Sequence, residues 1–442
     1  MNIEPSTSNA SAWTRRSFLA NSSVALLGGA VLPGLSTMNA AQASGADPIK
    51  IALIGCGKRG SGAASQALTT TGQVKLVAMA DVSAEQMNAS QQVLQQKQGA
   101  KVEVPAAHQF TGFDGYKEAI ALCDVAILTA PPGFRPLHFE EAVRQGKHVF
   151  MEKPLAVDAP GVRRILAAAA EAKQKGLKVG VGLQRRHKPG YLEAVKRIQD
   201  GACGELHTLQ CNWLGSAREG LERLPGETEM QYQIRNWYFY TWLSGDHIVE
   251  QHVHNIDVIH WIKGTHPIRA QGMGGRQVRT GKIHGHIFDH HFVEYEFADG
   301  SRCFSQSRQI RGIYANISER VVGSKGSGDL MNDRNLFKIT GPTAWRYGGD
   351  KLDAYQLEHD DLFEAIRKDK PYAEAEFGAI STMIGIMGRM ATYSGKQIEW
   401  DEAFNSKLEL VPARYAWDAA PPILPNADGF YPATLPGRTI AL

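Results

Sequence analysis

Residues 49–60 read I-K-I-A-L-I-G-C-G-K-R-G, and this stretch decides the fold of the chain. The mostly apolar residues 49–54 predict a strand buried on both faces, and the residues after the last glycine predict a helix. Gly55, Gly57 and Gly60 follow the strand with G-x-G-x-x-G spacing. In such a turn the first glycine permits the tight bend, the second lets a pyrophosphate approach the backbone, and the third lets helix and strand pack closely. The stretch therefore predicts a dinucleotide site.

A second predicted strand, residues 74–80, ends at Asp81, 21 positions after Gly60. A carboxylate at this spacing is typical of the residue that binds the 2′-hydroxyl of the adenine ribose. It would repel a 2′-phosphate by about 1–4 kcal/mol in a partly wet site, so we expect NAD(H) rather than NADP(H). Lys58 and Arg59 oppose this preference, because cations in the loop could hold a phosphate. The alternative interpretation is a glycine-rich turn with a capping aspartate.

The composition excludes several classes of protein. The 442 residues are 43% hydrophobic, and 48 basic side chains nearly balance 45 acidic ones, without a basic stripe that would favour a nucleic-acid partner. The length allows two domains. Five cysteines without C-x-x-C or metal-ligand spacing indicate free, mostly buried thiols.

The first 43 residues have the features of a targeting signal. Residues 14–19 read T-R-R-S-F-L, a twin-arginine sequence, and residues 18–32 form an uncharged run too short and too polar for a stable membrane span. Residues 41–43, A-Q-A, offer a cleavage site. We therefore expect export of the folded protein to the periplasm and a mature chain that begins near Ser44. An uncleaved N-terminal anchor is the alternative.

The rest of the chain divides into three parts. Alternating short strands and helices over residues 44–185 predict a doubly wound parallel sheet of the Rossmann type. Residues 186–411 predict an α+β domain with an open, mostly antiparallel sheet, and the late helix at 377–394 would pack back on the first domain. Residues 412–442 combine six prolines with aromatic side chains, which indicates an arm docked on its own or a neighbouring subunit. We expect a homo-oligomer, a dimer or tetramer, formed through the open sheet.

The order of these motifs resembles the Gfo/Idh/MocA family, named after glucose–fructose oxidoreductase, inositol dehydrogenase and a rhizopine-catabolism protein. The resemblance rests on the glycine motif, Asp81, T-A-P-P at 129–132, G-K-H-V-F-M-E-K-P at 146–154, and E-Q-H-V-H-N-I-D at 250–257. It covers essentially the whole chain after the targeting signal. It implies NAD(P)-dependent oxidation or reduction of a small carbohydrate, a sugar, cyclitol or related polyol.

Hydride transfer from a carbinol needs a base for the hydroxyl proton and a cation or donor beside the developing alkoxide. Lys153 follows a buried parallel strand, where open α/β sheets bind ligands, and the resemblance makes it the lysine that contacts substrate and nicotinamide ribose. Residues 245–263 predict one helix, and because Glu250 and His254 are four residues apart we expect them on one face of it. The resemblance makes His254 the acid/base and puts Glu250 in the place of an orienting aspartate. A surface lysine and a core histidine are the alternatives.

Further candidates come from these motifs and from other parts of the chain. For the cofactor they are Pro131, Glu152 and Arg135. Arg135 could bind a phosphate or a substrate carboxylate, or it could form a salt bridge at a helix N-terminus. A cis bond before Pro154 is one way to hold the turn after Lys153. For the substrate they are Arg185 and Arg186 at a strand end, Asp257, which has a structural alternative, and Trp237, which could stack on a sugar or pack in the core.

Fifteen histidines raise the question of a metal, with His284, His286, His290 and His291 around one predicted strand, but without fixed ligand spacing we expect no metal site. An exported enzyme lacks a dependable pool of free NAD(H), so its cofactor should be tightly held and recycled in place. The leading hypothesis is an exported oxidoreductase acting on a sugar or glycoside hydroxyl. The alternatives are a redox-neutral NAD-dependent glycosidase that acts by transient oxidation and elimination, and a binding protein with a structural dinucleotide.

Overall fold

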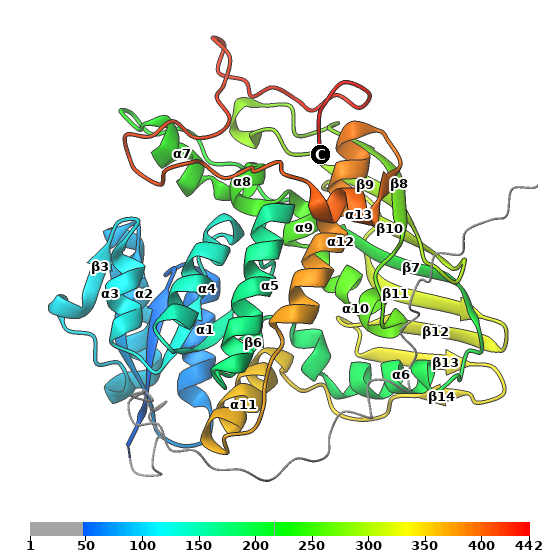
Figure 1. The fold of residues 1–442 in the computed structure, drawn as a ribbon, viewed down its shortest axis with the longest axis horizontal. Helices are drawn as coiled ribbons and strands as arrows, with labels where there is room; N and C mark the ends of the chain where they lie inside the picture. The colour runs from blue at the N-terminus through cyan, green and yellow to red at the C-terminus, as the bar shows by residue number, and fades with distance from the viewer. Residues whose placement is uncertain (1–46, 216) are drawn as a thin grey trace, which may run out of the picture. The chain divides into compact units, whose positions relative to one another are not determined.

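The computed structural model describes residues 47–215 and 217–442 (Figure 1). The twin-arginine sequence and the cleavage site expected within residues 1–43 lie outside the described residues. Two sheets, one parallel and one mostly antiparallel, organise the part that is described.

The first sheet is parallel, with the strand order β3-β2-β1-β4-β5-β6. Its strands are β1 (Ile49–Ile54), β2 (Val74–Asp81), β3 (Gln109–Thr111), β4 (Val125–Leu128), β5 (His148–Met151) and β6 (Val179–Val181). This confirms the predicted doubly wound sheet. The strand order reverses between β1 and β4, and sheets of this kind bind ligands at the carboxyl edge beside such a reversal.

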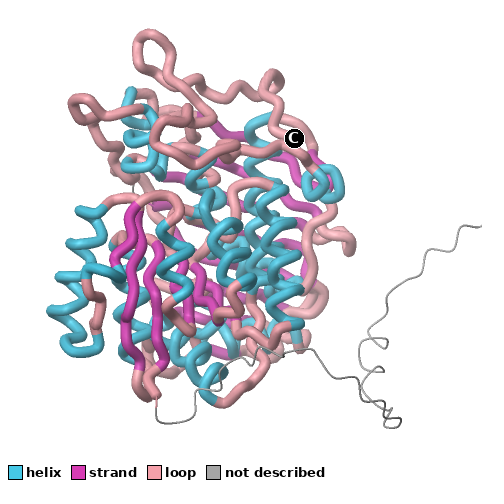
Figure 2. The backbone as a smooth tube through the Cα atoms, turned by 60° about the vertical axis from the view of Figure 1, so that its left-hand side comes forward, coloured by secondary structure: helices cyan, strands magenta, loops and turns pink. Residues whose placement is uncertain are grey.

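Helices cover both faces of this sheet (Figure 2). They are α1 (Lys58–Thr69), α2 (Ala84–Gln98), α3 (Gly115–Ala121), α4 (Arg135–Arg144) and α5 (Ala159–Gln174). Side chains of β1 alternate between two cores, because Ile51 and Leu53 pack with α1 and α2, whereas Ala52 and Ile54 face the other side. The α11 helix (Ala354–Arg367) also returns to this sheet, where its Leu362 joins the core beneath α1.

The second sheet has the order β14-β13-β12-β11-β7-β10-β9-β8-β15, and its neighbours are antiparallel except for the parallel pair β7 and β10. Its main strands are β7 (Leu206–Gly215), β8 (Arg269–Gly275), β9 (His290–Glu296), β10 (Arg302–Gln309), β11 (Asn316–Gly323), β12 (Gly326–Met331) and β13 (Leu336–Thr340), with short β14 (Trp345–Arg346) and β15 (Ile398–Glu399) at the edges. Along β9 buried and partly exposed residues alternate, as in a sheet with one covered face. The predicted open, mostly antiparallel sheet is confirmed.

The late helix α12 (Ala375–Ser394) lies between the two sheets (Figure 1). Its Thr382 Oγ1 accepts a hydrogen bond from the backbone N–H of Leu155, 3.1 Å away, just after β5. On the other side the Tyr295 hydroxyl of β9 donates to the carbonyl of Ile384 at 3.0 Å. Nearly all of α12 is buried, and it holds the parallel sheet against the antiparallel one.

The single helix predicted over 245–263 is wrong. The structure has α8 (Thr241–Ser244), α9 (His247–Glu250) and α10 (Val253–Lys263) instead. In a continuous helix the carbonyl of Glu250 would accept from the backbone of His254, but here it accepts from Nζ of Lys153. Glu250 and His254 therefore belong to different helices and do not share a helix face.

The last segment, residues 412–442, lies on its own chain and crosses above α7 (Glu229–Arg235) and α8 (Figure 1). The Tyr415 hydroxyl donates to the carbonyl of Gly133 at 3.0 Å, and Gln233 Nε2 donates to the carbonyl of Ile423 at 2.7 Å. All five cysteines are in the described residues, are buried and form no disulfide. None of the described helices has the length and apolar character that crossing a membrane requires.

Candidate active site

The glycine loop has a different steric environment at each glycine. Gly55 has φ +93°, and a Cβ there would lie 2.3 Å from the backbone nitrogen of Ala130. A Cβ on Gly60 would lie 2.1 Å from the carbonyl oxygen of Gly55, so this position lets α1 approach β1. A Cβ on Gly57 would meet no described atom within 4 Å. Gly57 thus borders open space at the N-terminus of α1, where the partial positive charge of a helix favours phosphate.

This difference predicts two distinct variant phenotypes. With the dinucleotide removed, Gly57→Ala should melt within about 2 °C of the wild type yet bind NAD⁺ at least about tenfold more weakly, because its methyl group occupies space that a pyrophosphate needs. Gly60→Ala should lose about 1–3 kcal/mol of folding free energy, because its methyl group overlaps backbone atoms. Thermal melting with and without NAD⁺ separates the two, and undiminished NAD⁺ binding by Gly57→Ala would contradict the assignment of the loop.

Asp81 is fixed at the end of β2 by the loop itself. One carboxylate oxygen accepts from the backbone N–H of Cys56 at 2.6 Å and the other from Ser83 at 2.9 Å. Burial raises the pKa of Asp81, and these backbone donors oppose the rise. Lys58 is exposed at the first turn of α1. Asp81 and Lys58 therefore both lie at the carboxyl edge of the sheet, Asp81 at the end of β2 and Lys58 at the start of α1.

Arg59 turns away from open solvent toward two other elements. Its Nε lies 3.0 Å from Oε1 of Glu152, directly after β5, and its guanidinium lies 4.8 Å from the ring centre of Tyr355 on α11. Arg59 is thus already paired within the protein, whereas Lys58 remains the exposed cation of the loop.

Lys153 and Glu250 form a nearly buried ion pair between the two parts of the chain. Nζ of Lys153 lies 3.0 Å from Oε1 of Glu250, and the side chains are 10% and 9% exposed. The Lys153–Pro154 peptide is cis, in agreement with the sequence expectation. Glu250 therefore holds the lysine rather than the imidazole for which the sequence had proposed it.

Arg135 and Pro131 lie in the segment that follows β4. Arg135 is 1% exposed and donates from Nη1 to the carbonyl of Leu128 at 2.6 Å. Burial lowers the pKa of Arg135 to about 10, while the nearby charges of Glu152 and Glu250 oppose that effect. Arg135 is therefore a buried cation beside the Lys153–Glu250 pair, not a salt bridge at a helix surface. Pro131 is half-buried at the start of the same segment.

His254 lies at the start of α10 and is 4% exposed. Burial lowers its pKa well below the usual value of 6.5, and the charges of Lys153 and Arg185 act in the same direction. The charge of Lys153 thus acts on the His254 imidazole, although the helix that was expected to present the imidazole is broken. A neutral imidazole next to an ammonium can accept a proton while the ammonium stabilises an oxyanion.

The structure places the four predicted substrate residues in three different surroundings. Arg185 is buried beside His254 and pairs with Glu319 of β11. Arg186 forms a bidentate ion pair with Asp257 through distances of 2.8–3.0 Å, and Asp257 is 1% exposed. The pair is packed against α12, since Asp257 also accepts from Ser381. Trp237 is half-buried against Tyr238, with ring centres 5.5 Å apart.

Buried polar atoms without a hydrogen-bond partner gather at this site. Among the described residues they include Nε of Arg135, Oε2 of Glu250, Nδ1 of His254 and both carboxylate oxygens of Glu358. Buried polar groups are rarely left unpaired unless a ligand or water satisfies them. Together with the open space at Gly57, they fit a dinucleotide that runs along the carboxyl edge toward Lys153.

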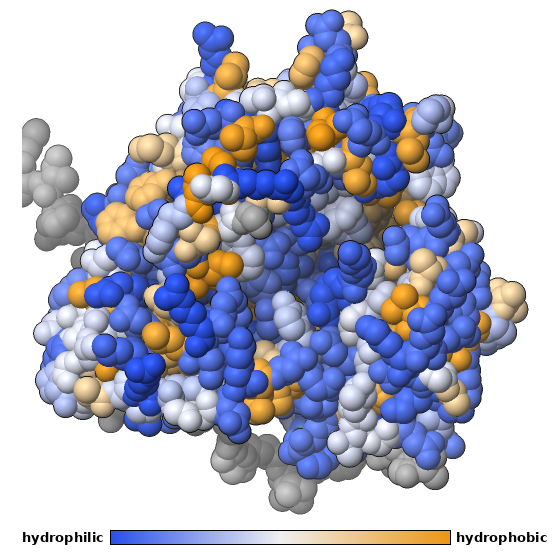
Figure 3. All heavy atoms as spheres, turned by 180° about the vertical axis from the view of Figure 1, so that it is seen from behind, coloured by the Kyte–Doolittle hydropathy of each residue, from blue (hydrophilic) through white to orange (hydrophobic). Residues whose placement is uncertain are grey.

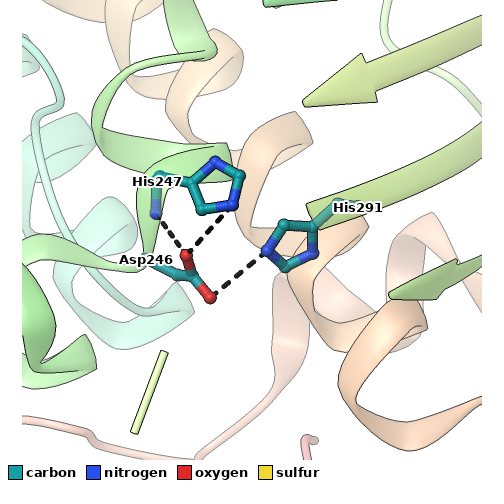
Figure 4. A group of neighbouring side chains, drawn as sticks. All are labelled: Asp246, His247 and His291. Atoms are coloured by element: carbon teal, nitrogen blue, oxygen red, sulfur yellow. Dashed lines mark hydrogen bonds and ion pairs between the residues drawn. The ribbon is translucent and has the colours of Figure 1, made fainter. Parts of the chain in front are cut away.

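Within residues 47–215 and 217–442, one group of side chains has ligand atoms close enough to hold a metal, namely Asp246, His247 and His291 (Figure 4). The carboxylate of Asp246 is already occupied. It accepts from the Tyr393 hydroxyl at 2.6 Å, from the backbone N–H of Phe288 at 3.0 Å and from Nε2 of His291 at 3.2 Å. We therefore interpret the cluster as a buried hydrogen-bonded anion that fixes the turn before α9.

Sequence reasoning missed three residues at the site. Trp213, near the end of β7, stacks against His254 with ring centres 6.1 Å apart and planes at 26°. Tyr355 and Glu358 on α11 contact or influence the Arg59–Glu152 pair. The position of Trp213 at the end of an alternating strand was a usable signal, whereas the contacts of α11 come from a helix some 200 residues away from β5.

A glycine loop on a doubly wound sheet, with an amine and an imidazole where that sheet meets a second one, defines a dinucleotide-dependent oxidoreductase. Residues 49–182 match the family model described as "Oxidoreductase family, NAD-binding Rossmann fold", and residues 191–328 match the "GFO/IDH/MocA C-terminal domain". Inositol 2-dehydrogenases of Ralstonia nicotianae and Burkholderia cenocepacia are each 30% identical, over 64% of this chain and 74% of theirs. The chain belongs to the Gfo/Idh/MocA family of oxidoreductases.

Solved structures share the fold. An oxidoreductase domain protein from Kribbella flavida superposes with a TM-score of 0.65 at 18% identity, over 80% of this chain and 99% of that chain. Levoglucosan dehydrogenase in complex with NADH and levoglucosan gives 0.64 at 16% identity, over the same shares. An aldose-aldose oxidoreductase from Caulobacter crescentus gives 0.62 at 18% identity, over 80% of this chain and 100% of that chain. At these identities the likeness concerns the fold alone.

Proposed function

We propose that the protein is an exported NAD-dependent oxidoreductase that moves hydride between a tightly held cofactor and a hydroxyl group of a sugar, glycoside or cyclitol. The observation that carries this is the Lys153–Glu250 ion pair beside the neutral imidazole of His254, at the carboxyl edge of the dinucleotide-binding sheet. The relatives named inositol 2-dehydrogenase support a cyclic polyol as substrate. Figure 3 shows a hollow with mainly hydrophilic walls on one face of the molecule, which suits a polar substrate.

The residues divide the chemistry between them. When bound, the nicotinamide accepts or returns the hydride. His254 accepts the hydroxyl proton on its neutral imidazole, and Lys153 donates a hydrogen bond from Nζ to the oxygen that becomes negative. Glu250 holds the lysine in place and balances its charge in a site that is largely closed to water. For reduction of a ketone the same two residues return the proton and steady the oxygen.

The site favours NAD(H) over NADP(H). The Asp81 carboxylate is held at the end of β2 by two backbone N–H groups, so a 2′-phosphate approaching that point would meet a fixed carboxylate. Arg59, one of the two cations that oppose this preference, is engaged by Glu152. The purified mature protein should release NAD⁺ or NADH on denaturation, and release of NADP(H) would contradict this assignment of Asp81.

Export and self-association complete the proposal. The twin-arginine sequence would deliver the protein folded, with its dinucleotide already bound, to the periplasm. The open face of the second sheet presents Met273, which is 71% exposed, and the stacked rings of Phe292 and Phe304, 6.3 Å apart. Such apolar groups on an unpaired face support a dimer or tetramer through this sheet. Light scattering on the purified protein would show a monomer if this surface had another use.

One experiment separates the proposed reaction from its closest rival. The protein is incubated without added cofactor with myo-inositol, D-glucose or a nitrophenyl glucoside, while absorbance of reduced nicotinamide and release of nitrophenol are followed. We expect a lasting change in reduced nicotinamide that a second carbonyl or polyol substrate resets. Nitrophenol release without net redox change would identify the redox-neutral glycosidase instead. No change with any of these compounds, with the dinucleotide present, would overturn both.

A further inference from the structure

Trp213 is the accessible member of an otherwise buried group around the proposed base. His254 and Arg185 are 4% and 3% exposed, whereas Trp213 is half-buried. On β7 the side chains of Leu209, Cys211 and Trp213 point to the face that α10 covers, since alternate residues of a strand share a face. Leu209 and Cys211 are buried there, and Trp213 is where this row leaves the core.

The pairing of β7 with β10 shows which residue of this row lies beside which residue of the segment that carries the proposed base. Cys211 lies opposite Ser305 of β10, whose hydroxyl is 2.7 Å from Nε2 of His252 just before α10. The next position of the row is Trp213, and its ring lies against His254. The indole therefore lies at the level of the imidazole that would take the substrate proton.

A buried ion pair, Arg185 with Glu319, lies next to the Trp213 indole. The guanidinium of Arg185 lies 6.0 Å from the centre of the Trp213 ring. Glu319 fixes this guanidinium through an ion pair and also accepts from the Tyr191 hydroxyl at 2.8 Å and from Asn255 Nδ2 at 2.6 Å. Arg185 therefore acts as a positioning residue for the indole rather than as the substrate contact that the sequence had suggested.

We propose that Trp213 is the surface on which the C–H face of a ring-shaped substrate stacks, and that it makes the enzyme select cyclic over open-chain polyols. This inference deepens the proposed function and rests on it. A pyranose or cyclitol ring presents several C–H groups on one face and its hydroxyl groups at the rim, so it can cover an aromatic ring while the rim is hydrogen-bonded. An open-chain polyol has no such flat face and would gain little from the indole.

The test compares Trp213→Ala and Trp213→Phe with Trp345→Ala. The control removes another half-buried tryptophan, on β14 at the far edge of the second sheet, where Arg197 covers its ring at 4.8 Å. With myo-inositol or D-glucose, whichever the wild type oxidises, Trp213→Ala should raise KM about 10- to 100-fold and change kcat less than about threefold. Trp213→Phe should recover most of that loss, and Trp345→Ala should match the wild type.

The second readout is selectivity between a ring and a chain. The wild type should prefer the cyclic compound over D-sorbitol in kcat/KM, and Trp213→Ala should lose most of that preference. Calorimetric binding of the cyclic compound to the cofactor-loaded protein should weaken in parallel with KM. If Trp213→Ala does not fold, Trp213→Leu keeps an apolar side chain without a flat ring and should show the same loss.

The outcomes distinguish this inference from the function on which it rests. An active wild type whose KM and selectivity are unchanged in Trp213→Ala would overturn the stacking role alone. A fall in kcat with unchanged KM would also overturn it, because Trp213 would then act only by positioning His254. A wild type that oxidises neither cyclic compound would overturn the proposed function, and the stacking role with it.

Discussion

Replacing Lys153 with methionine should lower kcat/KM by at least about 10³-fold while the dinucleotide stays bound. The ammonium of Lys153 is the donor placed where charge develops on the substrate oxygen, and removal of one such group from a closed site typically costs two to three orders of magnitude. The base His254 also loses a neighbouring charge that keeps it neutral, since Lys153 is one of the groups that lower its pKa. Steady-state kinetics and release of dinucleotide on denaturation measure the two effects separately.

The same variant should also be less stable, and this needs a control. Glu250 is 9% exposed, so loss of its partner leaves a nearly buried carboxylate unpaired, which typically costs 3–5 kcal/mol. The double variant Lys153→Met with Glu250→Gln removes both charges and should regain most of the stability without regaining activity. A double variant that is both stable and active would show that Lys153 has no part in the chemistry.

Replacing His254 with glutamine should lower kcat/KM about 10²- to 10⁴-fold, the usual range for loss of a general base. Glutamine keeps a polar side chain of similar size but cannot accept a proton at neutral pH. Because Lys153 and Glu250 are untouched, the melting temperature and the bound dinucleotide should be close to those of the wild type. Normal turnover by this variant would remove His254 from the mechanism.

The pH dependence gives a second readout of His254. Burial lowers its pKa well below 6.5, so the imidazole stays neutral and competent as a base in mildly acidic solution. We therefore expect the acid limb of kcat/KM below pH 6.5. The free energy of unfolding of the wild type should also fall as the pH drops below 6.5, because the unfolded chain then binds a proton at His254 that the folded protein does not. His254→Gln should therefore gain stability relative to the wild type between pH 7 and pH 5.

Local chemistry explains what could be predicted from the sequence. The glycine spacing, the apolar strand before it and the aspartate after the next strand act over short distances, and each is found at its expected place. The cis bond before Pro154 is equally local. The fold class followed from these elements because alternation of strands and helices leaves few ways to build a sheet.

The partners of the site residues depend on contacts between distant parts of the chain, and these could not be predicted. The helix over 245–263 is broken where Lys153, 97 positions earlier, takes the carbonyl of Glu250. Helical spacing and the family resemblance both pointed to His254 as the partner of Glu250, and neither showed this contact with Lys153. Arg185 and Arg186 are adjacent in sequence, yet Arg185 pairs with Glu319 of β11 and Arg186 pairs with Asp257 beside α12. The sequence showed their charges but not what neutralises them.

A crystal structure of the protein with NAD⁺ and a cyclic polyol tests the central claim most directly. The account predicts a pyrophosphate at Gly57 and the N-terminus of α1. It also predicts a nicotinamide near Lys153, and a substrate hydroxyl within hydrogen-bond distance of both Nζ of Lys153 and the imidazole of His254. A dinucleotide bound elsewhere, or a substrate that reaches neither residue, would contradict it.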